Sequence, residues 1–145
     1  MTQEDKDLLL KDLCARLPYK PIVHIDDCGI WDLRGIDHDD SAELRDRVIV
    51  WHGENYPSSK NSFPIINCKP YLFPLSSMTE EQNDSWRDAW FPDLMTSTAV
   101  NYPESEKYLV LSHVKSMQWL YENHFDVNGL IDKGLAIDAT GLNIY

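Results

Sequence analysis

The sequence predicts a single α+β domain, spanning residues 1–145, in which a small, mostly antiparallel sheet packs against an N-terminal helix and two later helices. Three observations predict this class. Leucines recur at helical spacing near the N-terminus, short segments between residues 22 and 66 alternate apolar and polar residues, and capped helical segments follow residue 79. A chain of 145 residues with 43% hydrophobic content is long enough to bury one core.

The N-terminal helix begins at a capping box. Thr2 is the expected N-cap, and Asp5 stands where its carboxylate can reach back to the cap. Apolar residues then follow at helical spacing, and they are Leu9, Leu10, Leu13, Cys14 and Leu17. The helix should end near Leu17, because Pro18 disfavours a helical conformation in the residue before it.

The sheet is expected between residues 22 and 66. Residues 22–25 and 30–36 flank a turn at 26–29 and predict a β-hairpin. Residues 47–51 predict a third strand, and residues 63–66 a short fourth one. The intervening polar segments at 37–45 and 53–61 predict loops, the first of them with room for one helical turn.

The second half begins with an extended segment and a helix. Pro70 and Pro74 bracket residues 71–73, which must therefore be extended. Thr79 and Gln82 form a second capping box, and Pro92 stops the helix that follows. Residues 93–104 look irregular.

The C-terminal third contains a last helix and a closing segment. Residues 107–111 favour a strand, after which Ser112 is the expected N-cap of a helix. The alternative is a helix that runs through residues 107–111. Val114, Met117, Tyr121 and His124 share one side of that helix. Turns follow at two glycines, and four apolar residues beyond them should be buried: Leu130, Ile131, Leu135 and Ile137.

Composition restricts the class of protein. Aromatic residues make up 11% of the chain, which argues against disorder. No apolar run approaches the roughly 20 residues that a membrane helix needs, and the polar, acidic start is unlike a secretory signal, so we expect a cytoplasmic protein. The three cysteines are odd in number and form no C-x-x-C pair, which predicts reduced thiols.

The net charge of −11 excludes direct binding of nucleic acid through a basic face. Eight acids and two arginines lie between Asp26 and Asp46. They serve either solubility or an acidic face for a basic protein partner. In the second interpretation the candidate partner-binding residues are Asp37, Asp39 and Asp40.

No spacing in the chain completes a known catalytic or cofactor motif. A G-x-S-x-G elbow and glycine-rich phosphate loops are absent from the sequence. His24, His38 and His52 with nearby aspartates are the only candidates for metal chemistry, and their spacing does not suggest a four-ligand site. We therefore expect no metal and no cofactor. Trp86 and Trp90 share a helix face and are candidate contacts for a protein partner.

Three segments carry a family resemblance. KPYLFPLSSMTEE at 69–81 resembles the signature KPYLRPLSSMTEEE. A second signature, WLN…HFDYRGLIEKGLALEA, is similar to residues 119–137, which contain WL, HFD, GLI and KGLAI. The segment LLLKDLCARLPY at 8–19 resembles the usual N-terminal segment of the same proteins. The chain thus resembles an uncharacterised family of small proteins from gut anaerobic bacteria and their phages and prophages. Two positions differ from these signatures. Phe73 stands where the first signature has Arg, and Val127-Asn128 stands where the second has Tyr-Arg.

Three functions fit these observations. The first is a non-enzymatic protein-interaction (accessory) protein of phage or prophage origin. The second is an acidic mimic of nucleic acid that inhibits a DNA-binding protein. The third is a metal-dependent hydrolase of unrecognised type.

Overall fold

The computed structural model describes the backbone of residues 1–38, 46–51, 61–90 and 102–145, and the side chains of 1–37, 47–50, 61–89 and 110–145. Within these ranges the chain forms three α-helices and a six-stranded, mostly antiparallel sheet, so the predicted α+β class is confirmed. The helices are α1 (Gln3–Arg16), α2 (Glu80–Trp90) and α3 (Tyr102–Glu122). The strands are β1 (Ile22–Ile25), β2 (Gly29–His38), β3 (Asp46–Trp51), β4 (Asn61–Pro64), β5 (Cys68–Leu72) and β6 (Ile137–Asp138). Short 3₁₀ turns lie at Leu17–Tyr19, Ile65–Asn67 and Leu75–Ser77.

Both predicted capping boxes are confirmed. The Thr2 hydroxyl accepts from the Asp5 amide, and the Asp5 carboxylate accepts from the Thr2 amide. Thr79 and Gln82 make the same reciprocal pair at the start of α2. These contacts join residues three apart, which is why the sequence was sufficient to find them.

The sheet has the strand order β4-β3-β2-β1-β5-β6, and only the β5–β6 pair is parallel. The predicted hairpin is the β1–β2 pair, in which Ile25 lies opposite Gly29. Two boundaries were wrong. β2 continues to His38, so Asp37 lies in a strand rather than a loop, and β4 covers Asn61–Pro64 rather than 63–66. Pairing with β3 fixes both ends, and such pairing is not visible in the local sequence.

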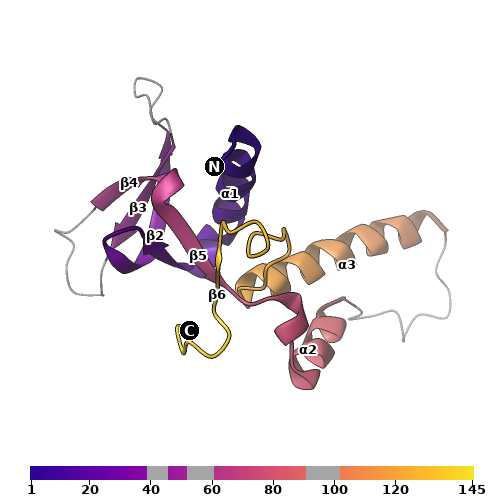
Figure 1. Ribbon diagram of the computed structural model, residues 1–145. Helices are drawn as coiled ribbons and strands as arrows, with labels where there is room; N and C mark the ends of the chain where they lie inside the picture. Colours follow the sequence, from indigo (N-terminus) through magenta and orange to yellow (C-terminus); the bar gives the residue numbers. More distant parts are fainter. Residues whose placement is uncertain (39–45, 52–60, 91–101) are drawn as a thin grey trace.

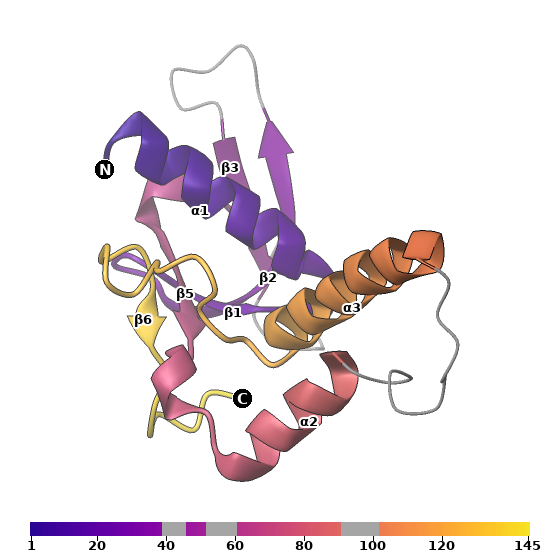
Figure 2. The same ribbon diagram turned by 90° about the vertical axis from the view of Figure 1, so that its right-hand side faces the viewer.

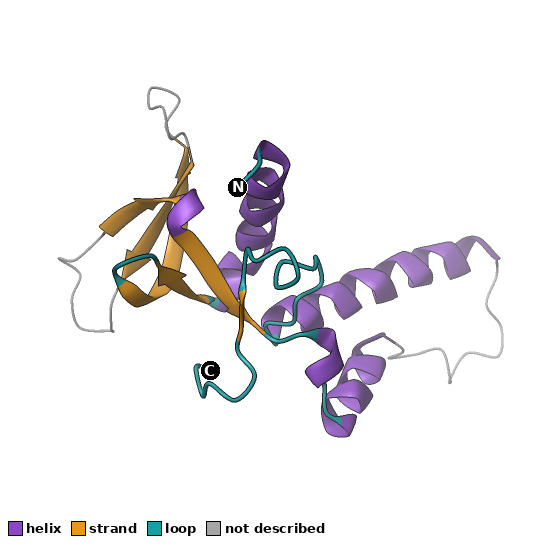
Figure 3. Cartoon of the chain, viewed as in Figure 1, coloured by secondary structure: helices purple, strands orange, loops and turns teal. Residues whose placement is uncertain are grey.

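One face of the sheet carries the core. Helix α1 lies across that face (Figure 2), and the three α-helices lie on the same side of the sheet (Figure 3). Leu9 and Leu13 of α1 pack there against the fully buried Val23, Ile25 and Val50. Within the described ranges the opposite face of the sheet carries no helix.

The sheet extends beyond the predicted region of residues 22–66. β5 joins the sheet beside β1, and β6 adds a parallel strand from the C-terminal segment. Of the four apolar residues expected to be buried there, Leu130 and Leu135 are buried, while Ile131 and Ile137 are half-buried. The segment is thus part of the core.

The expected strand at 107–111 is wrong, and the alternative of a continuous helix is correct. α3 begins at Tyr102, so the last residues of the stretch expected to be irregular are also helical, and Ser112 lies inside the helix rather than at its cap. Tyr108 and Val110 favour a strand locally, but the stretch is continuous with a 21-residue helix that packs against α2 elsewhere along its length. We call α2 and α3 the helical arm, because they pack on each other and α3 extends away from the sheet (Figure 1).

Candidate docking surface on the helical arm

Of the predicted partner-binding residues, the structure describes the side chains of Asp37 and Trp86, which lie in different parts of the molecule. Asp37 is exposed on β2, whereas Asp39 and Asp40 lie outside the described residues. Trp86 is half-buried on α2. Trp90 is the last residue of α2, and its side chain lies outside the described ones. The acidic and aromatic candidates whose side chains are described therefore do not share one site.

The acidic cluster is divided in space. Asp26 and Asp27 lie in the β1–β2 turn, and Asp37 lies near the far end of β2, roughly 25–30 Å away at the rise of an extended strand. Between them, the Asp32 carboxylate pairs with Arg34 at 3.4 Å. Asp37 lies opposite Arg47 in the β2–β3 register. The described part of the cluster is thus a face of mixed charge.

Of the three histidines in the metal-site hypothesis, His24 is the one whose side chain the structure describes. His24 is half-buried on β1, with its Nδ1 atom 3.5 Å from the Tyr71 hydroxyl. His38 ends β2 and its side chain lies outside the described ones, as does all of His52. Among the described residues, no group of three His, Cys, Asp or Glu side chains is placed to hold a metal ion.

Trp86 belongs to the interface inside the helical arm. Its indole Nε1 donates to the Ser116 hydroxyl of α3 at 2.9 Å. The same ring lines an open groove of about 390 Å³, and the other lining residues are Leu75, Met78, Thr79, Glu80, Asn83 and Leu120. Trp86 therefore joins the two helices and shows only part of its ring to solvent.

Helix α3 has an inverted burial pattern at its outer half. The face toward α2 contains Ser112 and Ser116, which are only 9% and 5% exposed. Val110, Leu111 and Val114 are instead 63%, 47% and 45% exposed. Burial of apolar surface stabilises a folded protein. A helix that packs on α2 would therefore be expected to turn its valines and leucine toward α2 and its serines toward solvent. We call Val110, Leu111 and Val114 the arm patch.

The arm patch continues a stripe of residues that is half-buried further along α3, at Met117 and Tyr121. Val110, Val114, Met117 and Tyr121 recur at alternating spacings of four and three, which places them along one side of the helix. At the inner end, the Arg16 guanidinium of α1 lies 4.8 Å above the Tyr121 ring. At the outer end the stripe has no such cover among the described residues, and its valines are exposed. The helical spacing predicts Val114, Met117 and Tyr121 on one side, whereas Val110 and Leu111 fall in the stretch that was expected to be a strand.

A buried polar network holds the inner end of α3 to α1. Arg16 and Asp12 are fully buried and pair at 2.7 Å, four residues apart. The Arg16 guanidinium also donates to the Phe125 carbonyl at 2.7 Å, and Asn128 donates to the Asp12 carboxylate at 2.8 Å. Because a buried charge is costly unless it is paired, this network ties α1 to the chain that directly follows α3.

The two signature segments of the family resemblance lie side by side. The Phe73 amide donates to the His124 carbonyl at 2.9 Å, and the Asp126 amide donates to the Phe73 carbonyl at 2.8 Å. The Asp126 carboxylate then accepts from the amides of Leu130 and Ile131, both at 2.9 Å. The conspicuous residues of these segments therefore form a structural junction between β5 and the chain after α3.

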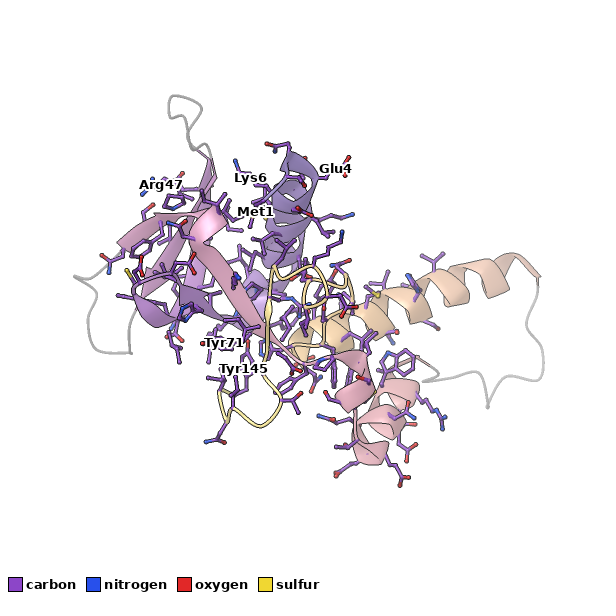
Figure 4. The ribbon with its side chains drawn as sticks, in the orientation of Figure 1. Met1, Glu4, Lys6, Arg47, Tyr71 and Tyr145 are labelled. Atoms are coloured by element: carbon purple, nitrogen blue, oxygen red, sulfur yellow. The ribbon has the colours of Figure 1, made fainter. Side chains whose placement is uncertain are left out.

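The end of the chain is fastened to the same junction. The Tyr145 ring stacks on His124 with centroids 3.8 Å apart, and its hydroxyl donates to the Tyr71 carbonyl at 2.9 Å (Figure 4). Burial, with a smaller contribution from the Arg16 charge, lowers the pKa of His124 to about 4. Burial raises the pKa of Tyr145 to about 12. Both rings are therefore neutral around pH 7.

All three cysteines lie within the described residues, and no disulfide joins them. Cys14 and Cys28 are exposed, whereas Cys68 is buried in the core. Burial, with a smaller contribution from the Asp26 charge, raises the pKa of the Cys68 thiol to about 12. A thiol in that state is a poor nucleophile, so Cys68 serves packing.

No family model, no curated protein and no solved structure matches this chain. Within the described ranges, no helix combines the length and the apolar character that crossing a bilayer requires.

Proposed function

We propose that this chain is a non-enzymatic accessory protein that acts by binding another protein chain, with the arm patch on α3 as its docking surface. Its phage or prophage origin rests on the signature segments. The observation that carries the proposal is the inverted burial of α3, in which Ser112 and Ser116 face α2 while Val110, Leu111 and Val114 face solvent.

The cost of this arrangement supports an external use for the patch. Fully burying a Val or Leu side chain contributes roughly 1.5–3 kcal/mol, so leaving three of them half exposed forgoes a few kcal/mol of folding free energy. Grouped apolar residues on a projecting element are typical of protein interaction sites. A partner helix could lie along the stripe by the helix-in-groove mode, with anchors three and four residues apart.

The two other functions receive less support. A nucleic-acid mimic needs a dense and regular array of acids, but the described acids of the Asp26–Asp46 cluster are spread along β2 and its turn. They lie beside Arg34 within the cluster and opposite Arg47 on β3. A metal-dependent hydrolase needs converging ligands, and His24 points to Tyr71 instead.

Site-specific photo-crosslinking in the native host tests the proposal. A benzophenone amino acid replaces Val114 in the full chain, and a matched variant carries it at Leu142, which is exposed to a similar degree near the C-terminus. We expect a discrete protein adduct from position 114 and none from position 142. The same adducts from both positions, or none from position 114, would contradict the proposal.

A further inference from the structure

We infer that the occupant of the arm patch is a second copy of this chain, paired through α3 about a twofold axis. This inference rests on the proposed function, since it names the partner of the same surface. It is carried by the charge distribution along the helices, by the shape of the molecule and by the size of the patch.

The arm patch lies in the least acidic helical segment of the chain. Residues 110–121 contain one charged side chain, Lys115, besides His113. By contrast, α1 carries four acids and α2 carries four more, which are Glu4, Asp5, Asp7, Asp12, Glu80, Glu81, Asp84 and Asp88. Two copies with a net charge of −11 each repel one another, and the repulsion is weakest where acids are absent from both approaching surfaces. The segment around Val114 meets that condition.

The shape of the molecule lets two such segments meet. α3 extends away from the sheet and from α1 (Figure 1), so two antiparallel α3 helices can cross while the sheet and the acidic α1 of each copy stay at opposite ends. A twofold contact uses the same patch on both copies, and it therefore needs no second complementary surface. The spacing of four between Val110 and Val114 suits packing of one helix against another.

The size of the patch sets the strength of the pairing. Three half-exposed side chains per copy form less than the ~800 Å² per partner of a standard stable interface. The dimer should therefore be weak and should depend on protein concentration. Salt should strengthen it, because screening reduces the repulsion between the bodies and leaves the apolar contact in place.

Sedimentation velocity of the full chain tests this inference, at protein concentrations from about 1 to 200 μM and at low and high salt. We expect a shift from monomer to dimer with concentration, at lower concentrations in high salt. Val110→Glu with Val114→Glu should raise the dissociation constant at least about tenfold. The matched control is Ile30→Glu with Leu142→Glu, which charges two side chains of similar exposure elsewhere and should leave the constant unchanged. Circular dichroism shows that each variant is folded.

A cysteine scan checks the geometry of the pair. In a background with Cys14→Ser and Cys28→Ser, Leu111→Cys should form an intermolecular disulfide under mild oxidation, while Lys11→Cys on α1 should not. A chain that stays monomeric at every concentration, or a dimer that both double variants weaken equally, overturns the inference. If the chain is monomeric and position 114 cross-links to a different protein, the second-copy inference fails while the proposed function stands.

Discussion

At the scale of single residues, a buried ion pair in α1 and a buried histidine after α3 connect distant parts of the chain. Arg16 and Asp12 have no exposed surface, and they are acceptable in the core only because they pair with each other and with Phe125 and Asn128. His124 adopts a left-handed backbone conformation with a φ of 60° and stays neutral beneath the Tyr145 ring. The charge state of His124 should therefore affect stability.

The pH dependence of unfolding follows from the lowered pKa of His124. Its pKa is about 4 in the folded chain and 6.5 in the unfolded chain, so the unfolded state binds the proton first as the pH falls. Stability should be fully present above pH 6.5 and should decline by on the order of 3 kcal/mol toward pH 4. Denaturant titrations at several pH values measure this slope.

A variant separates His124 from the other titrating groups. His124→Asn tolerates the left-handed conformation and has no proton to gain, so it should flatten the slope between pH 6.5 and 4. The exposed His113→Asn should keep the wild-type slope. Hydrogen bonds from Thr2 and Thr140 lower the pKa of Asp5 and Asp138, so any contribution of these carboxylates is lost only at lower pH. A slope that survives in His124→Asn would assign it to another group.

At the scale of elements, local signals were predictable and long-range pairing was not. Both capping boxes and the β1–β2 hairpin involve residues close in sequence, and all three were found from the sequence alone. The pairing of β6 with β5 joins residues more than 60 positions apart, and nothing in the local sequence near Ile137 predicts it. The start of α3 was missed because a run of branched residues favours a strand in isolation.

The C-terminal segment should be indispensable for folding. Leu130 is fully buried in the main core, and the Ala139 amide donates to the Leu72 carbonyl at 2.8 Å. Leu130→Ala should lower the free energy of unfolding by about 2–5 kcal/mol, whereas the exposed Leu142→Ala should change it by less than about 0.5 kcal/mol. Truncation after Asn128 should unfold or aggregate the chain. Equal melting temperatures for the full and the truncated chain would show that the segment is an appendage.

At the scale of the whole molecule, the candidate site was only partly predictable. The sequence identified Val114, Met117 and Tyr121 as one side of a helix, and it identified Trp86 as a contact residue. It could not predict which side of α3 faces α2, because the serines that do so carry no hydrophobic signal. The binding role of Asp37, Asp39 and Asp40 stays a prediction, but the described acids of the Asp26–Asp46 cluster are spread along β2 and its turn.

The acidic residues at the end of β2 should not contribute to folding. Asp37 is exposed, and Asp39 and Asp40 follow it outside the described residues. The triple change to Asn should leave the free energy of unfolding within about 0.5 kcal/mol of wild type. If these acids attract a basic partner, the same variant should weaken its binding at low salt and much less at high salt. Equal affinity for both chains at both salt concentrations would assign the cluster to solubility.

In the proposed function, the arm patch serves binding rather than folding. The direct measurement is the free energy of unfolding of one triple variant, which combines Val110→Ser, Leu111→Ser and Val114→Ser. The protein concentration is kept low enough that the chain is monomeric. Because these side chains face solvent, the triple variant should stay within about 1 kcal/mol of wild type while losing its cross-link and its dimer. A loss of about 3 kcal/mol or more would show that the patch is buried within the molecule and would contradict the account.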